Sequence, residues 1–326
     1  MNNILVTGAR GLVGSNLVKT LLSITDDKIV CMHTGSLNKT RLQYQGITDD
    51  NIVWVQGILQ DKDFVERTIN NYEITDVYHL AAVSVVRKAS RNPIVCFDTN
   101  VRGTWNLLEA CRTSGTVNRF IGMSSDKAYG EHSELPYKED FALKAVNTYD
   151  ASKAMEDILI RTYAYNYGLN AVVARACNIY GPGDFNYSRI IPNSIRRILD
   201  GERPIIWRGV NEYIREFVYV QEVVAALVHM CGASVKYRGD AFNIATGDIW
   251  SVERMVNEIA DIMHSDLRAE IIEKELTFKE IPKQYLDGAK LKEALNVKPG
   301  MVFSIRDKGM AKTIDWYTKV FENGVK

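Results

Sequence analysis

Short runs of apolar, mostly β-branched residues alternate with amphipathic stretches through the first half of the chain. Bounded runs of this kind predict strands. The predicted strands are Asn3–Thr7, Lys28–Met32, Ile52–Gln56, Asp76–Leu80, Arg119–Met123 and Ala171–Arg175. The predicted helices between them include Gly11–Leu22, Asp61–Asn71, Val101–Thr113 and Tyr149–Tyr167. Strand and helix in regular succession indicate parallel βαβ units, so we expect an α/β fold with a doubly wound parallel sheet.

The alternation becomes less regular after about Cys177. Residues Asn178–Asp184 have the composition of a turn, and Ile190–Asp200 has helical periodicity. Strand patterns return at Glu216–Val220 and Ala241–Ile244. We therefore expect a dinucleotide-binding domain at 1–177, with returning segments near 214–245. Residues 178–326 would then form a smaller, partly interleaved α/β domain that binds the substrate.

Bulk composition excludes several classes of protein. The 326 residues include 40 Lys plus Arg and 40 Asp plus Glu, so the formal net charge is zero. A strongly basic nucleic-acid binder or a polybasic membrane-surface protein is therefore not expected. With 46% apolar and 25% charged residues, the chain has the composition of a globular protein rather than a disordered one.

The cysteines, the histidines and the N-terminal segment bear on metal binding and on the cellular compartment. The five cysteines are scattered without a CxxC arrangement, so we expect neither a disulfide framework nor a zinc site. The five histidines lack metal-ligand spacing, and we expect no metal. The first residues lack a signal-peptide pattern, and no apolar run approaches the roughly 20 residues that span a bilayer. We expect a reduced, cytoplasmic protein without membrane contact.

A glycine-rich turn follows the first predicted strand. In ILVTGARGLVGSNLV the strand leads into Gly8, Gly11 and Gly14, and a helix begins within the motif. Glycines at such a turn let backbone N–H groups approach a pyrophosphate and let the helix pack close to the strand. Three glycines alone also occur in ordinary turns, but the strand before and the helix after them are the required context. The motif predicts a Rossmann-type dinucleotide site.

The acidic residue that usually accompanies such a site is absent. In NAD-binding folds it lies about 20 positions on and binds the ribose 2′-hydroxyl. Here the second strand ends in His33, which Thr-Gly-Ser follows, with Lys39 and Arg41 beyond. A 2′-phosphate would meet no repulsion there, although the same residues can form a solvated loop. NAD and NADP both remain open.

A tyrosine and a lysine lie one turn apart at the start of a predicted helix. Tyr149 and Lys153 are spaced i and i+4, so they share one face of that helix. A cation beside a phenol favours the phenolate and lowers the pKa of the tyrosine. A base that removes a hydroxyl proton during hydride transfer needs such a pKa. The same spacing also arises by chance as a surface pair.

Polar residues end the fifth predicted strand. Ser124, Ser125, Asp126 and Lys127 follow the apolar run directly. Residues at the carboxyl ends of parallel strands line the ligand crevice, so we expect them to face the same crevice as Tyr149.

These motifs occur together and in order, and the chain resembles the extended short-chain dehydrogenase/reductases of the NAD-dependent epimerase/dehydratase family. The resemblance covers essentially the whole chain. Its motifs are Gly8-x-x-Gly11-x-x-Gly14, Asp76–Ala82, Asn100–Ala110, Ser124-Ser125, Tyr149-x-x-x-Lys153, Asn178–Pro182, Arg215–Val220 and Glu280–Asp287.

Within that family the likeness is greatest to CDP-glucose 4,6-dehydratase-type proteins. It is carried by Ser125-Asp126-Lys127, by Leu80–Arg87 and by Gly183–Pro192. In 4-epimerases the positions of Asp126 and Lys127 usually carry small residues. One departure is that Gly57 is followed by Ile58, where relatives often have an aspartate that reaches toward the adenine. The base and the sugar of the substrate therefore stay open.

The resemblance implies a mechanism. Tyr149 would take the C4 hydroxyl proton while Ser125 binds the same oxygen, and Lys153 would hold the ribose. Asp126 would protonate the departing C6 hydroxyl, and Lys127 would assist loss of the C5 proton. A structural ion pair is the alternative interpretation of Asp126 and Lys127.

The resemblance also implies binding residues and partners. NAD or NADP, tightly bound, would contact Gly8, Gly11, Leu12, Val13, Gly14, His33, Leu80, Ala81, Ala82, Asn100, Tyr149 and Lys153. The nucleotide-diphosphate sugar would contact Ser84, Asn178, Arg189 and Arg215, although solvated arginines are the alternative for the last two. Helices carrying Asn100–Thr113 and Tyr149–Tyr167 would form a homodimer interface.

Three hypotheses of function follow. The first is a nucleotide-sugar 4,6-dehydratase, possibly acting on CDP-glucose, which oxidises C4 transiently, eliminates water across C5–C6 and returns the hydride. The second is a nucleotide-sugar 4-epimerase of the same family. The third, from another class, is a non-catalytic dinucleotide-binding sensor, which the intact Ser125, Tyr149 and Lys153 disfavour.

Overall fold

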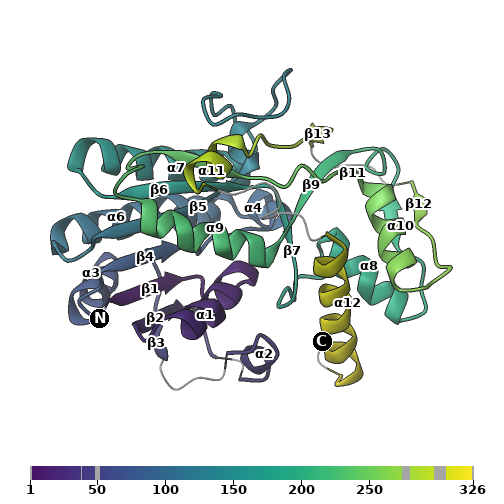
Figure 1. Ribbon diagram of the computed structural model, residues 1–326, viewed down its shortest axis with the longest axis horizontal. Coiled ribbons are helices and arrows are strands. Elements are labelled where there is room, and N and C mark those ends of the chain that lie inside the picture. Colours follow the sequence, from purple (N-terminus) through teal and green to yellow (C-terminus); the bar gives the residue numbers. More distant parts are fainter. Residues whose placement is uncertain (1, 38, 48–51, 274–279, 297–305, 325–326) are drawn as a thin grey trace.

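A seven-stranded parallel sheet forms the centre of the larger part of the molecule (Figure 1). The computed structural model describes residues 2–37, 39–47, 52–273, 280–296 and 306–324. The strand order is β3 (Ile52–Gln56), β2 (Lys28–His33), β1 (Asn3–Thr7), β4 (Asp76–His79), β5 (Arg119–Ser125), β6 (Ala171–Ala176) and β10 (Ala241–Ile244). The predicted α/β fold with a doubly wound, Rossmann-type sheet is confirmed. In such sheets the order reverses beside β1, and the ligand crevice lies at that point.

Helices cover both faces of this sheet because each strand buries apolar side chains on both sides. The helices on one face are α1 (Leu12–Ile24) and α9 (Val220–Ala233). The helices on the other face are α3 (Lys62–Asn71), α6 (Gly103–Ser114) and α7 (Thr148–Tyr167). Among the described residues no helix is both long and apolar enough to cross a membrane.

A second sheet lies beside the first, toward α8, α10 and α12 on the right of Figure 1. Its strands are β7 (Asn178–Tyr180), β9 (Ile214–Tyr219), β11 (Ile249–Ser251) and β13 (Lys283–Gln284). A further pair is β8 (Ile205–Trp207) with β12 (Glu270–Ile272). The helices of this part are α8 (Ile190–Leu199), α10 (Val252–Ile262) and α12 (Arg306–Glu322).

Two sequence expectations need correction here. The expected turn at Asn178–Asp184 begins with a strand, because Asn178–Tyr180 pairs in parallel with Phe217–Tyr219 of β9. Of the stretch 214–245, α9 and β10 return to the main sheet, whereas β9 lies in the smaller one.

Several short elements lacked a clear pattern in the sequence. They are α2 (Lys39–Tyr44), α4 (Val86–Arg91), α5 (Pro93–Phe97), α11 (Ala289–Ala294), a π-helical turn at Asp98–Arg102 and a 3-10 turn at Asp126–Tyr129. The π-helical turn continues directly into α6, so the helix predicted at Val101–Thr113 begins within irregular structure. Such turns often occur at functional sites.

Close packing places α7 against the end of β5. A Cβ atom on Gly122 of β5 would lie 2.2 Å from Ile160 Cδ1 of α7, so a side chain there would require Ile160 to move. On the neighbouring strand, the buried Arg175 guanidinium bonds both oxygens of Asp157, at 2.7 and 3.0 Å. These contacts direct the first turns of α7, with Tyr149 and Lys153, toward the carboxyl end of β5.

Candidate active site

The glycine turn lies where β1 and β4 end side by side. Gly8 has φ +70°, and a Cβ there would lie 2.7 Å from Ala81 N. A Cβ on Gly14 would lie 2.2 Å from Gly8 O, so α1 can begin this close to the turn only without a side chain. Gly11 is the N-cap of α1, with no side-chain cap and no acidic residue in the first turn. Helix N–H groups that no side chain caps, on a glycine backbone that no side chains cover, fit a pyrophosphate.

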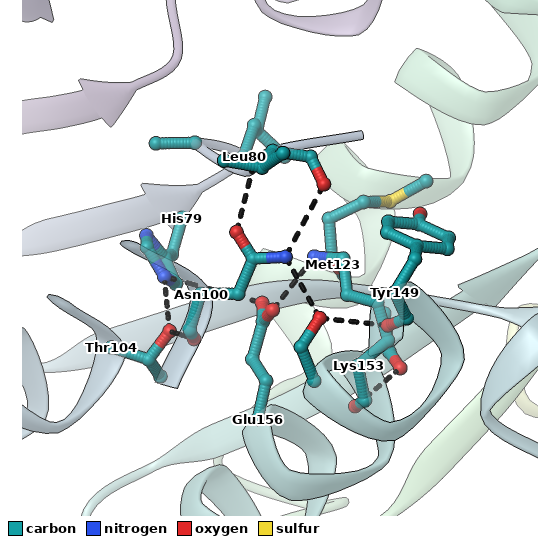
Figure 2. A network of polar contacts seen from close by, with 12 residues as sticks. His79, Leu80, Asn100, Thr104, Met123, Tyr149, Lys153 and Glu156 are labelled. Atoms are coloured by element: carbon teal, nitrogen blue, oxygen red, sulfur yellow. Dashed lines mark hydrogen bonds and ion pairs between the residues drawn. The ribbon is translucent and has the colours of Figure 1, made fainter. Parts of the chain in front are cut away.

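A buried chain of hydrogen bonds fixes the loop that follows β4 (Figure 2). His79 Nδ1 lies 2.8 Å from Thr7 Oγ1, and His79 Nε2 lies 2.7 Å from Thr104 Oγ1. The Thr104 hydroxyl donates to Asn100 O, so His79 Nε2 must carry the proton. Thr7 Oγ1 in turn accepts from the N–H groups of Leu80 and Ala81.

His79 is therefore a structural residue. Complete burial lowers its pKa to about 3, so the ring is neutral at ordinary pH.

Asn100 connects the same loop to α7. Its Oδ1 accepts from Val83 N at 2.7 Å, and its amide donates to Ser152 Oγ at 2.9 Å. The Ser152 hydroxyl donates to Tyr149 O at 2.7 Å. Asn100 is fully buried, so its amide is committed to the backbone around Leu80–Val83 and to the first turn of α7. The Leu80, Ala81 and Ala82 backbone, predicted to meet the cofactor, is placed through these contacts.

Tyr149 and Ser125 meet at the end of β5, as the sequence predicts. Burial dominates and raises the pKa of Tyr149, against a side-chain hydrogen bond with Ser125. The charge of ionised Glu156 raises it further, and the positive charge of Arg189 opposes it. The expected lowering of the Tyr149 pKa by a neighbouring lysine is therefore wrong for the protein without ligands.

Lys153 makes contacts that the sequence did not predict. Its ammonium donates to Met123 O at 2.6 Å and to Glu156 Oε2 at 2.7 Å (Figure 2). An ammonium has three N–H donors, so one remains for a ribose hydroxyl. Lys153 is only 3% exposed. Its charge is thus shared with a carboxylate rather than directed at Tyr149 alone.

Asp126 and Lys127 lie in the turn after β5. Asp126 is buried, and its Oδ1 accepts from Ser125 Oγ at 2.9 Å. Burial raises the pKa of Asp126, against the charges of Lys127 and Arg215. Among the described residues, Asp126 Oδ2 has no hydrogen-bond partner. A carboxyl in this position tends to keep its proton.

Two further carboxylates surround Lys127. Its ammonium lies 3.9 Å from Glu280 Oε1, and a small hollow is lined by Lys127, Asn147, Asp150 and Glu280. Burial raises the pKa of Asp150 to about 6, against the charge of Lys127. The structure thus places Lys127 beside two acidic side chains.

The four predicted substrate residues fall into two groups. Arg189 donates to Asp184 Oδ2 at 2.8 Å and reaches Ser84 Oγ at 3.5 Å, so it links the α8 loop to the loop after β4. Arg215 lies 3.4 Å from Glu280 and donates to the carbonyl of Pro282. Asn178 donates its amide to Glu216 O in the second sheet. Arg189 and Ser84 meet directly, whereas Asn178 is committed to the backbone of β9.

At the end of β2 His33 is buried, whereas Thr34, Gly35 and Ser36 after it are exposed. His33 is 7% exposed, bonds Gly35 O through Nδ1 at 3.0 Å and packs edge-on against Trp54. Burial lowers its pKa, and the charge of Arg10 lowers it further. Arg10 itself donates to Ser36 O at 2.7 Å. The side chains of Lys39 and Arg41 lie outside the described residues.

Sequence reasoning missed four groups at this site: Arg10, Asp150, Glu156 and Glu280. Glu156 could have been found, because positions 149, 153 and 156 repeat at i, i+4 and i+7 on one helix face. Glu280 begins the Glu280–Asp287 motif of the resemblance, but no local pattern marks it as a neighbour of Lys127. No group of three or more potential metal ligands occurs among the described residues.

Comparisons with known proteins agree with this geometry. The family model described as GDP-mannose 4,6 dehydratase matches residues 5–308. The chain is 30% identical over 97% of its length to the trifunctional UDP-glucose 4,6-dehydratase, 3,5-epimerase and reductase of Arabidopsis thaliana, but spans only 47% of that protein.

Two solved structures are similar over nearly their whole length. The dTDP-glucose 4,6-dehydratase of Streptomyces venezuelae is 24% identical, with a TM-score of 0.87, and the match covers 99% of this chain and 100% of that one. The UDP-glucose 4-epimerase of Thermotoga maritima is 28% identical, with a TM-score of 0.87, and the match covers 98% and 99%. Overall similarity does not separate the two reactions.

Proposed function

The chain belongs to the family of NAD-dependent nucleotide-sugar dehydratases and epimerases, and from that premise we propose that it is a nucleotide-sugar 4,6-dehydratase. One observation carries the choice of reaction. A buried carboxyl with a raised pKa, Asp126, is hydrogen-bonded to Ser125 at the end of β5. Elimination of water needs an acid that protonates a leaving hydroxyl, whereas exchange of configuration at C4 needs none.

The residues at the end of β5 have different roles in the proposed reaction. When bound, NAD would accept the hydride from C4 and later give it back to the sugar. Tyr149 Oη takes the proton of the sugar C4 hydroxyl, and Ser125 Oγ bonds the same oxygen. Asp126 donates its proton to the departing C6 hydroxyl. The C5 proton, acidified by a ketone at C4, leaves to a base near Lys127.

The environment of Lys127 bears on that base. Lys127, 3.9 Å from Glu280 and beside Asp150, would place a positive charge near the developing enolate. Of the two carboxylates beside Lys127, we assign the role of proton acceptor to Asp150, whose pKa burial raises to about 6.

Cofactor and substrate classes follow from the family and the site. The turn at Gly8–Gly14 and the N-terminus of α1 fit the pyrophosphate of NAD. Residues 178–326 would receive the nucleotide-diphosphate sugar, with Arg189 and Arg215 as diphosphate ligands because a guanidinium binds phosphate bidentately. CDP-glucose is one candidate among several nucleotide sugars.

The protein is proposed to act as a cytoplasmic homodimer. On α7 the side chains of Met155, Ile158 and Tyr165 are exposed, and their spacing puts them on one face. Trp105 of α6 is also exposed, at 56%. Exposed apolar side chains gathered on two adjacent helices fit a second copy of the chain.

The test is conversion of a panel of nucleotide sugars, namely CDP-, UDP- and dTDP-glucose and GDP-mannose. We expect one of them to yield a product that has lost one water, detected by mass spectrometry. Tyr149→Phe should abolish conversion. A wild-type protein that converts a sugar only to an isomer of unchanged mass is an epimerase, and the proposal is then wrong.

A further inference from the structure

A buried carboxylate, Glu156, lies on the helix face of the proposed base and its lysine, and the reaction as described does not use it. Tyr149, Lys153 and Glu156 follow at i, i+4 and i+7 along α7. Figure 2 shows the Glu156 side chain directed toward Lys153, from beneath the loop that carries Leu80. Glu156 is fully buried, and its Oε2 accepts from the Lys153 ammonium at 2.7 Å.

The second oxygen of Glu156 is not stabilised by a donor. Its Oε1 lies 4.0 Å from His79 Nε2, beyond hydrogen-bond distance, and has no partner among the described residues. The His79 N–H is committed to Thr104 Oγ1, and that ring is neutral. The carboxylate therefore relies on Lys153 alone for electrostatic compensation.

Within the described part of the chain, Lys153 is the group whose charge lowers the pKa of Glu156. On α7, Asp157 is negative but pairs with Arg175 of β6. The polar groups contributed by the neighbouring elements are uncharged. They are the neutral His79 of β4, the Thr104 hydroxyl of α6 and the Met123 carbonyl of β5. Burial and the charge of Asp157 raise the pKa of Glu156 to about 7, against the ammonium of Lys153.

We propose that Glu156 is a positioning residue that tunes the proposed base, by holding Lys153 at Met123 and by opposing ionisation of the Tyr149 phenol. This deepens the function proposed for the same site. The Lys153 charge that would favour the phenolate is partly neutralised by Glu156. The negative charge of Glu156 itself acts on the phenol in the same unfavourable direction.

The expected size of the effect follows from distance. Seven residues of helix separate the two groups by about 10 Å, and at an effective dielectric constant near 20 one charge then shifts the phenol pKa by about one unit. Removing the charge should therefore lower the midpoint of phenol ionisation by about one pH unit.

The test is a phenolate absorbance titration of the cofactor-loaded protein, which needs no substrate. The Tyr149 signal is the difference between each protein and the same protein carrying Tyr149→Phe. Glu156→Gln keeps a hydrogen-bond acceptor for Lys153 and removes the charge, whereas Glu156→Met removes both. We expect both variants to lower the midpoint alike, by about one pH unit.

Glu109→Gln is the matched control, because Glu109 is a partly exposed carboxylate of α6 that pairs with Arg112. It should leave the Tyr149 midpoint unchanged. A shift in Glu156→Met alone would assign Glu156 a purely structural role and overturn the proposal. So would a Tyr149 midpoint that stays unmoved in both variants.

The pH profile of kcat/KM gives a second readout with whichever nucleotide sugar the wild type converts. Its acid limb should move to lower pH by about one unit in Glu156→Gln. If no sugar is converted, the proposed function fails while the absorbance titration still decides the role of Glu156.

Discussion

Asp126 is the residue on which the choice between elimination and epimerisation depends. Its carboxyl is buried, accepts a hydrogen bond from Ser125 and has a raised pKa. We predict that Asp126→Asn slows loss of water by about 10²–10⁴-fold, the usual contribution of a general acid, while oxidation at C4 continues. Rapid mixing would detect this as reduced nicotinamide that accumulates without dehydrated product. An unchanged rate of water loss would remove Asp126 from the reaction.

The rate of water elimination should change with pH in a defined direction. Burial raises the pKa of Asp126, so the proton needed by the leaving hydroxyl is present below that raised pKa and is lost as pH rises through it. The rate of water elimination should therefore fall on the alkaline side in the wild type. In Asp126→Asn this limb should be absent, and a limb that persists would belong to another group.

At the scale of single elements, the start of α1 is limited by backbone contact. A Cβ on Gly14 would lie 2.2 Å from Gly8 O. We predict that Gly14→Ala lowers the free energy of unfolding by about 1–3 kcal/mol and releases the cofactor, because the turn must open. Urea denaturation and nucleotide analysis of the denatured protein measure the two effects.

Gly232→Ala in α9 is the control for that substitution. A Cβ there meets nothing within 4 Å, and the backbone is helical. Alanine should increase the free energy of unfolding by up to about 1 kcal/mol, since glycine is the poorer helix former. Equal effects of both substitutions would contradict the contact argument.

The position of α7 depends on a buried ion pair. Asp157 and Arg175 are both fully buried and bonded through two oxygens. We predict that Asp157→Asn costs about 3–5 kcal/mol of unfolding free energy, because it leaves a buried guanidinium uncompensated. The double variant Asp157→Leu, Arg175→Met should cost less than this single change. Urea denaturation tests both, and a single variant within about 1 kcal/mol of wild type would contradict the assignment.

The sequence predicted most elements that have a regular period and a local signal. The strands β1 to β6, the glycine turn and the Tyr149–Lys153 spacing all fall in that group. It could not predict β7, because Asn178–Tyr180 is a strand only through its pairing with β9. It also missed the partner of Lys153, since a glutamate on an amphipathic helix looks like a solvated residue until packing buries it.

At the scale of the whole molecule, α6 and α7 expose apolar side chains that we propose are covered by a second copy of the chain. Ile158 is 54% exposed there. We predict that Ile158→Glu converts a homodimer into a monomer, because a charge cannot be buried unpaired at an interface. Sedimentation velocity measures the change. Ile24→Glu, at an equally exposed residue of α1 on the opposite face of the sheet, should leave the oligomeric state unaltered.

The most direct test of the dehydratase account is conversion of a nucleotide sugar in deuterium oxide, followed by mass spectrometry. The account predicts a 4-keto product that has lost one water and has gained one solvent deuterium at C5. An isomer of the starting sugar without solvent deuterium, or a product whose formation is unaffected by Tyr149→Phe, would contradict it.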